Sequence, residues 1–160
     1  MKFGSFISAH AKFMASVKER RFLQFKIQGI PYVIDLLSIQ SVRPYEPPSL
    51  DLRLAPIFCG VIEVEVRSIP VVDFRQPMHV NHHMKEDSSG LIFLEENDTA
   101  VALAVDVIGE IVALDEASLQ PLEVLSTRIN NTYVQAIRGK NGQGLILLDA
   151  KAMLGKSLAR

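Results

Sequence analysis

The stretch Gly60–Phe74, GVIEVEVRSIPVVDF, decides how the rest of the chain is interpreted. Apolar and charged side chains alternate through its first half, with Ile62, Val64 and Val66 set against Glu63, Glu65 and Arg67. This period of two predicts a β-strand with one apolar and one charged face. Ser68 interrupts the alternation, and an apolar run containing a proline follows out of phase. The stretch therefore predicts a β protein and raises the question of what the charged face contacts.

The composition limits the class of protein. The 160 residues carry 17 basic and 18 acidic side chains, for a net charge of −1. A chain of this length suits one domain, or two small subdomains that share cores, and buries roughly 70% of its unfolded surface. No apolar stretch approaches the roughly 18 residues that a transmembrane helix needs. Nucleic-acid binding would require a basic patch, and the sequence shows none, so neither nucleic-acid binding nor membrane insertion is expected.

Cys59 is the single cysteine of the sequence, so no disulfide can form within the chain. A lone thiol suits a reducing compartment, and we expect the protein to be cytoplasmic. Within the apolar segment APIFCG, Cys59 is expected to be a small buried hydrophobe rather than a nucleophile.

Residues 1–20 are predicted to form a helical extension. Their apolar side chains recur near helical spacing, whereas Lys12 and Lys18 lie off that stripe. His10 and Lys12 interrupt what would be the apolar core of a signal peptide. Such a helix either packs on its own domain or docks to a partner or a membrane surface, and its modest basic charge favours the first.

From residue 21 onward the residue pattern predicts β-strands joined by turns. The four prolines of residues 43–56 predict an irregular connection, and residues 150–158 predict a short terminal helix. Strands are predicted at residues 22–27 and 32–42, and residues 60–74 predict a strand pair. Residues 91–94 and 99–114, with a turn at 95–98, predict a hairpin followed by more strand, and residues 133–138 and 145–149 predict another hairpin.

An internal regularity predicts two similar halves. The pattern of two apolar residues followed by aspartate ends at Asp35, Asp73, Asp106 and Asp149. Two halves, each with two strands that end in aspartate, would produce this pattern, because an aspartate at a strand end accepts hydrogen bonds from the next turn or caps a short helix. We therefore predict two similar β-barrel subdomains that meet in a common core. The apolar residues before each aspartate should be buried there: Ile34, Val72, Val105 and Leu148.

Two motifs suggest chemistry. AKAMLGKS (150–157) fits a loose phosphate-loop pattern, but its first part is a helix former and three residues follow it, too few for the helix that such a loop needs. The histidines His79, His82 and His83 could supply metal ligands, which makes a small metal-dependent hydrolase an alternative function. They lie in a polar segment that shows no rigid first shell and no supporting partners, so no metal, cofactor or enzyme activity is expected.

Four segments in this order resemble the CheW family of bacterial chemotaxis adaptors. They are FLQFKIQGIPYVIDLLSIQSVRPYE (22–46), GVIEVEVRSIPVVDFR (60–75), ALAVDVIGEIVALDEASLQPLE (102–123) and YVQAIRGKNGQGLILLDAKAML (133–154). The resemblance implies a CheW-like domain over residues 21–155, followed by a tail at 156–160. It also implies two interlocked, five-stranded SH3-like β-barrels. With the predicted N-terminal helix and the short C-terminal helix, this gives a mainly β fold class.

The resemblance also implies a function without catalysis. CheW-family proteins couple the cytoplasmic tips of chemoreceptors to the regulatory domain of a CheA-type histidine kinase. By resemblance, the protein is expected to be an adaptor in chemotaxis or in pilus-based motility. An alternative hypothesis is that the protein docks on the kinase but has lost receptor binding.

The sequence departs from the family at its receptor-facing positions. In the family the matching strand reads roughly Gly-Val-Ile-Asn-Leu-Arg-Gly, whereas here Glu65 stands in the arginine place and Val66 in the glycine place. Ser41 stands where the family has glutamate. Because β-branched residues rarely adopt positive φ, we expect the turn at Val66 to have changed shape or moved. The face is then either a redesigned contact or a plain solvated strand face, and the candidate partner-binding residues are Ile39, Ser41, Arg43, Gly60, Glu63, Glu65, Val66 and Arg67.

Overall fold

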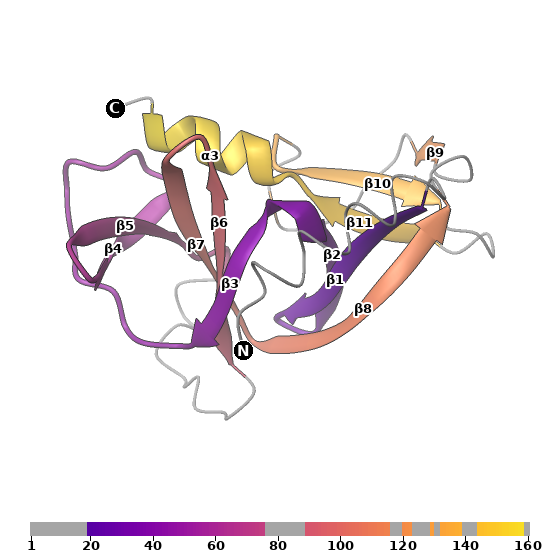
Figure 1. Cartoon of the computed structure of the whole chain (residues 1–160), viewed down its shortest axis with the longest axis horizontal. Helices are drawn as coiled ribbons and strands as arrows, with labels where there is room; N and C mark the ends of the chain where they lie inside the picture. Colours follow the sequence, from indigo (N-terminus) through magenta and orange to yellow (C-terminus); the bar gives the residue numbers. More distant parts are fainter. Residues whose placement is uncertain are drawn as a thin grey trace.

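The computed structural model describes residues 19–75, 89–115, 120–122, 129, 132–138 and 144–158. Within these residues the protein is mainly β, with two sheets and a helix near the C-terminus (Figure 1). In chain order the elements are β1 (Glu19–Ile27), β2 (Ile30–Asp35), the 3-10 helix η1 (Leu36–Ser38), β3 (Ile39–Pro44), β4 (Phe58–Val64), β5 (Arg67–Val72), β6 (Gly90–Glu96), β7 (Thr99–Val105), β8 (Val107–Asp115), β9 (Gln120–Leu122), β10 (Val134–Arg138), β11 (Gly144–Leu148) and α3 (Ala150–Leu158).

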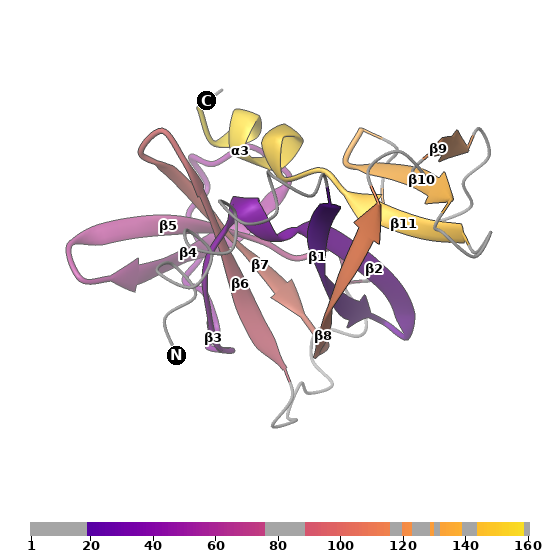
Figure 2. The same ribbon diagram turned by 45° about the vertical axis from the view of Figure 1, so that its right-hand side comes forward.

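The strands form two separate sheets. The first has the order β8-β1-β2-β11-β10-β9, and the second has the order β3-β6-β7-β5-β4. Figure 2 shows the two sheets side by side, with α3 continuing from β11 of the first sheet and packing on β6 and β7 of the second. The predicted mainly β fold with two subdomains and a short C-terminal helix is thus confirmed. The first sheet has one strand more than expected, because the three residues of β9 pair with β10.

The predicted N-terminal helix at residues 1–20 lies almost entirely outside the described residues. Strand β1 already begins at Glu19, where Glu19 and Arg20 pair with Asp115 and Leu114 of β8. The last two residues assigned to the extension therefore belong to the first sheet. At the other end α3 runs to Leu158, past the expected domain end at 155.

The two halves of the chain exchange strands. The first sheet takes β1 and β2 from the first half and β8 to β11 from the second, and the second sheet takes β3, β4 and β5 from the first half and β6 and β7 from the second. The strand order repeats as well, since β2 lies parallel to β11 and β7 lies parallel to β5. These four strands are the ones that end in the repeated apolar-apolar-aspartate pattern. The topology is therefore that of a twofold repeat, as the pattern predicted.

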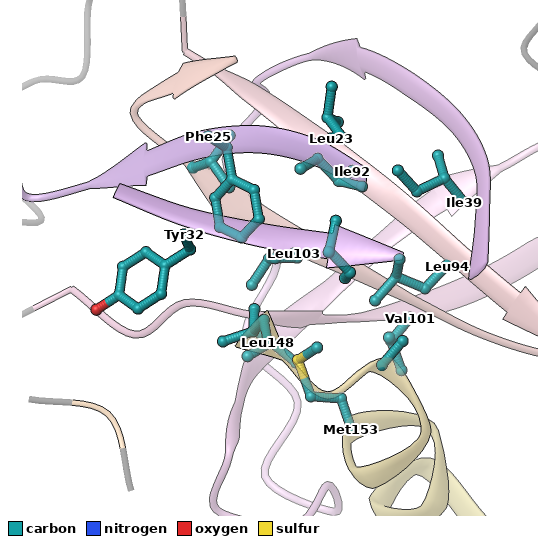
Figure 3. Close-up of a cluster of buried hydrophobic side chains, with 14 of the residues drawn as sticks. Leu23, Phe25, Tyr32, Ile39, Ile92, Leu94, Val101, Leu103, Leu148 and Met153 are labelled. Atoms are coloured by element: carbon teal, nitrogen blue, oxygen red, sulfur yellow. The ribbon is translucent and has the colours of Figure 1, made fainter. Parts of the chain in front are cut away.

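The largest hydrophobic core lies where the two sheets meet. Side chains from both sheets and from α3 converge in it, among them Leu23, Phe25, Leu94, Leu103 and Met153 (Figure 3). The four residues predicted to share this core do so, and each is at most 1% exposed: Ile34, Val72, Val105 and Leu148. Because side chains alternate along a strand, the neighbouring Val33, Val71 and Ala104 point instead into two smaller cores. Each sheet thus buries both faces, which explains the apolar composition.

Each of the four repeated aspartates accepts a backbone hydrogen bond. Asp35, Asp73 and Asp149 accept from the turn or helix that follows them, as expected, whereas Asp106 accepts from the distant Gln28. Asp35 accepts from the N–H of Leu37 at 2.9 Å and caps η1. Asp149 accepts from the N–H of Ala152 at 3.2 Å in the first turn of α3. The carboxylates of Asp73 and Asp106 are described with the site. These bonds satisfy donors that the strand and helix ends would otherwise leave unpaired.

The hairpin of β4 and β5 turns earlier than the alternation of its sequence indicated. The alternation predicted a strand running through Val66, with the interruption at Ser68. Instead β4 ends at Val64, which pairs with Arg67, and Glu65 and Val66 form a two-residue turn. Ser68 lies within β5, opposite Glu63. The alternation hid the turn because neither Glu65 nor Val66 belongs to the residue types that usually mark one.

Candidate functional site

The eight predicted partner-binding residues fall into two groups in the second sheet. Gly60 and Glu63 lie on β4, Glu65 and Val66 form the hairpin turn, and Arg67 begins β5. Ile39, Ser41 and Arg43 lie on β3. Strands β3 and β4 stand at the two ends of the strand order, and no ladder between them is present in the described part of the chain. The two groups are thus presented by different edge strands.

The tip of the β4–β5 hairpin is exposed and has an unusual backbone. Glu65 has φ of 58°, a left-handed conformation, whereas Val66 does not have positive φ. This is the pattern of a type II′ turn, which favours glycine at its first central position. The expectation that Val66 would avoid positive φ is met because Glu65 takes that conformation. Val66 is 97% exposed, so the tip presents an apolar side chain beside a carboxylate.

The three charged side chains of the predicted contact face do not act as one row. The carboxylate of Glu63 accepts a hydrogen bond from the hydroxyl of Ser68 at 2.5 Å. The guanidinium of Arg67 lies 3.5 Å from a carboxylate oxygen of Glu95 and donates to the carbonyl of Asp98 at 3.2 Å. Arg67 is therefore turned toward the neighbouring β6–β7 hairpin, and Glu63 and Glu65 remain as the acidic part of the exposed face.

The β3 group includes one buried residue. Ile39 is 4% exposed and belongs to the common core, so its side chain cannot meet a partner in this conformation. Ser41 is half-buried, and its hydroxyl donates to the side-chain oxygen of Gln40 at 2.6 Å. Arg43 is exposed, and its guanidinium carbon lies 5.1 Å from the centre of the Phe93 ring. Of this group, Ser41 and Arg43 reach the surface.

Gly60 has a structural role at the edge of β4. The connection between β3 and β4 passes over this edge, where Ser49 and Val61 exchange two backbone hydrogen bonds of 2.8 Å. A Cβ atom on Gly60 would lie 2.4 Å from the carbonyl oxygen of Ser49. Gly60 therefore permits the close approach of this connection.

Arg75, Asp73 and Asp106 form a buried ionic cluster that was not predicted as a site. Arg75 is 6% exposed, and its Nε donates to Asp73 at 2.7 Å while Nη1 donates to Asp106 at 3.0 Å. The second carboxylate oxygen of Asp106 accepts from the backbone N–H of Gln28 at 2.6 Å, in the β1–β2 turn of the first sheet. The cluster thus links the two sheets. The aspartates were singled out by their repeat, but their arginine was not.

The electrostatics of this cluster favour a permanently charged Arg75. Burial by itself lowers the pKa of Arg75, but hydrogen bonds and charges from Asp73 and Asp106 outweigh it and raise the pKa above its ordinary value. The guanidinium carbon also lies 5.5 Å from the centre of the Tyr45 ring, at the start of the β3–β4 connection. Burial in turn raises the pKa of Tyr45. The cluster is suited to holding segments together rather than to proton transfer.

Cys59 differs from its prediction as a buried residue. It is exposed by area, because it lies on β4 at the edge of the sheet. Desolvation of the thiol and the nearby carboxylate of Asp73 nevertheless raise its pKa to about 11. The thiol therefore stays protonated at neutral pH, which agrees with the expectation that it is not a nucleophile.

The described part of the chain contains no group of three or more histidine, cysteine, aspartate or glutamate side chains able to hold a metal ion. The histidines of the hydrolase alternative, His79, His82 and His83, lie outside the described residues. None of the described helices is long and apolar enough to cross a membrane.

Comparison with known proteins identifies the two-sheet domain. Residues 21–157 match the family model described as CheW-like domain. The chain belongs to the CheW-like family. The matched region begins where the resemblance placed the start of the domain and ends two residues beyond its expected end at 155.

Curated relatives and a solved structure agree with this membership. The CheW-like chain is 21% identical to chemotaxis protein CheW of Bacillus subtilis over 136 residues, which cover 85% of this chain and 87% of the relative. It is also 21% identical to chemotaxis protein CheW of Klebsiella aerogenes, with coverage of 84% and 81%. The crystal structure of the scaffolding protein TtCheW from Thermoanaerobacter tengcongensis matches with a TM-score of 0.65, at 20% identity, over 81% of this chain and 84% of that one. The last comparison establishes the shared fold.

Proposed function

We propose that this CheW-like protein is a cytoplasmic, non-catalytic adaptor that couples a chemoreceptor tip to the regulatory domain of a CheA-type histidine kinase. The observation that carries the proposal is the CheW-like domain over residues 21–157. The relatives with which it aligns along most of their length are chemotaxis proteins by name. The buried charges of the described residues hold segments of the fold together, which suits a scaffold.

The receptor side of the proposal depends on the hairpin tip. Two exposed carboxylates lie there, Glu63 and Glu65, and Glu65 stands where the family resemblance implies an arginine contact. A negative charge placed against Glu65 by a partner would cost several kcal/mol of binding free energy, roughly, because like charges repel across an interface. The adaptor would therefore bind a receptor tip that carries compensating basic residues. This partner belongs to a chemotaxis system or to one that controls pilus-based motility.

A second candidate keeps the kinase contact alone. It is favoured by the same observation, because Glu65 in place of arginine and Val66 in place of glycine would remove the usual receptor contact. The protein would then be a kinase-docking module. The metal-dependent hydrolase has no support from the family or from the described residues.

The proposal is tested by titrating the full chain with two partners encoded by neighbouring genes. They are the cytoplasmic tip of a chemoreceptor and the regulatory domain of a CheA-type kinase. Saturable binding of both partners supports the adaptor, and binding of the kinase domain alone supports the docking module. Failure to bind either partner would contradict both candidates. A receptor tip with acidic residues at its contact surface serves as a control, because Glu65 should exclude it.

A further inference from the structure

Among the described residues, the outer edge of β4 is hydrogen-bonded at a single residue pair. The β3–β4 connection, residues 45–57, crosses this edge, and we call it the strap. Ser49 donates to the carbonyl of Val61 and Val61 donates to the carbonyl of Ser49, each over 2.8 Å. This is an isolated bridge and not a ladder. The strap therefore occupies the place of a neighbouring strand for one residue pair.

The backbone of Glu63 faces the same edge as that of Val61. Along an edge strand, every second residue directs its N–H and C=O outward. Val64 and Arg67 close the two-residue hairpin and Ile62 pairs with Ile69, so Val61 and Glu63 are the outward-facing residues. The bond from Val61 to the strap confirms this phase. No described residue makes a backbone hydrogen bond to Glu63 along this edge.

The sequence of the strap explains why its cover stops at Val61. In an antiparallel continuation from the Ser49–Val61 pair, the residue opposite Glu63 is Pro47. Proline has no N–H, so Pro47 cannot donate to the carbonyl of Glu63. With respect to the described part of the chain, the edge from Glu63 to the hairpin tip is therefore open to another chain.

The chemistry of this open edge selects its occupant. Glu63 and Glu65 are exposed along it. A second copy of the chain would bring the same carboxylates close together, and like charges across strands destabilise pairing. By contrast, the edge strand β3 carries Arg43 and Pro44, residue types that natural sheets use to discourage pairing. A basic, extended segment fits the β4 edge best.

We propose that the open edge of β4 at Glu63 binds an extended basic segment of a partner protein, which adds to the second sheet as a further strand. Backbone hydrogen bonds to Glu63 provide the register, and lysine or arginine side chains lie against Glu63 and Glu65. Val66, at the tip, contacts an apolar side chain of the same segment. That this partner is the receptor rests on the proposed function, whereas the strand addition itself does not.

The direct test is a titration of the isotope-labelled full chain with a capped heptapeptide of alternating lysine and valine. The expected result is saturable shifts of the amide signals of Val61 and Glu63. Two controls separate the causes of binding. A peptide with glutamate in place of lysine should bind at least tenfold more weakly, and so should a lysine peptide N-methylated at its lysines, because the lysine opposite Glu63 must donate its N–H to the carbonyl of Glu63. N-methylation at the valines should leave binding nearly unchanged, because the valine N–H groups point away from β4.

Variants locate the site. Glu63→Lys should weaken peptide binding about tenfold while leaving the fold intact, because the side chain is exposed. Gly60→Ala should displace the strap, lengthen the open edge and strengthen binding, since its Cβ would clash with Ser49. Gly155→Ala is the matched control, because its Cβ would meet nothing within 4 Å. It should leave peptide binding unchanged.

Three results would overturn the strand addition. They are equal binding of the N-methylated peptides, no effect of Glu63→Lys, and amide shifts confined to the edges formed by β3 or β8. Peptide binding at Glu63 without receptor binding would leave this inference standing and contradict the receptor part of the proposed function. Receptor binding by a chain whose Glu63 amide does not shift when the peptide is added would do the reverse.

Discussion

Arg75 donates from Nη1 to the carboxylate of Asp106 over 3.0 Å, although 31 positions separate the two residues in the chain. The same carboxylate accepts from the backbone of Gln28 in the other sheet. Arg75 also pairs with Asp73, whose side chain is 6% exposed while its own is 2% exposed. One buried cation therefore joins the end of β5, the end of β7 and, through Asp106, the turn between β1 and β2.

Removing this cation should strongly destabilise the fold. Arg75→Met leaves the carboxylate of Asp73 buried without its partner, and such a loss costs about 3–5 kcal/mol of unfolding free energy. Arg75→Lys should cost less, because it keeps the charge but loses the planar fork that contacts both aspartates. Urea unfolding of the variants measures both values.

The control for Arg75 is another arginine paired with an aspartate, but at the surface. The side chain of Arg53 is 84% exposed and bonded to Asp51. Arg53→Met should leave the urea midpoint unchanged within error, since exposed ion pairs contribute little. If Arg75→Met and Arg53→Met had equally small effects, the linking role of Arg75 would be wrong.

Cys59 should react slowly with alkylating reagents in the folded protein. Its pKa is raised to about 11, so at pH 8 its thiolate fraction should be about 240-fold below that of an ordinary cysteine with a pKa of about 8.5. The alkylation rate should rise with pH until about pH 11. Measuring the rate with iodoacetamide from pH 7 upward, in buffer and in urea, gives the comparison.

The same shift links Cys59 to stability at high pH. Between the pKa of Cys59 in the unfolded chain and its raised pKa in the folded protein, the folded state binds more protons than the unfolded state. The contribution of Cys59 to the unfolding free energy therefore falls as pH rises through this window. Cys59→Ser should therefore reduce the loss of stability on the alkaline side. An alkylation profile with an inflection near the ordinary cysteine value in the folded protein would contradict this prediction.

The turn at Glu65 should be improvable. A non-glycine residue in the left-handed conformation costs about 1–2 kcal/mol of folding free energy. Glycine avoids this cost, but it loses more conformational entropy on folding, which offsets part of the gain. Glu65→Gly should therefore raise the unfolding free energy by roughly 0.5 kcal/mol. Val66→Gly is the matched control, because Val66 has no positive φ and glycine there should lower stability by about 0.5–1 kcal/mol. Thermal unfolding of both variants decides, and a destabilising Glu65→Gly would show that the turn carries no strain.

The strands and the common core could be predicted from sequence, because both depend on local periodicity. The alternation along each strand, together with the aspartate repeat, located Ile34, Val72, Val105 and Leu148 in the core. Local patterning could not locate the end of β4, because Glu65 and Val66 lack turn chemistry, and only the family resemblance placed a turn at Val66. By contrast, the β6–β7 turn at Asn97 and Asp98 was predicted, and both residues have positive φ, which these residue types tolerate.

The candidate site was harder to predict because it depends on strand order. Nothing local in the sequence indicates that β3 and β4 lie at the two ends of one sheet, or that Ser49 passes over Gly60. The burial of Ile39 and the pairing of Arg75 with Asp106 likewise arise from contacts between distant segments. Such contacts follow from the family fold rather than from the spacing of the residues that make them.

The last prediction concerns charge reversal at the hairpin tip. Glu65 is exposed, and arginine would adopt the same turn conformation at a similar cost. Glu65→Arg should therefore change the unfolding free energy by no more than about 0.5 kcal/mol. Its effect should appear in binding. If a basic receptor tip contacts Glu65, the reversal should weaken receptor binding by several kcal/mol, roughly, at low salt and by less at high salt.

The alternative gives the opposite sign. If the receptor contact has been lost, Glu65→Arg combined with Val66→Gly should create binding to an ordinary acidic receptor tip. Binding of the kinase regulatory domain should stay nearly constant in either case, provided that it uses a separate surface, as the family resemblance implies. Titrations of both partners at two salt concentrations distinguish these outcomes. If neither affinity changes, Glu63, Glu65 and Arg67 form a solvated strand face and the redesigned-contact hypothesis is wrong.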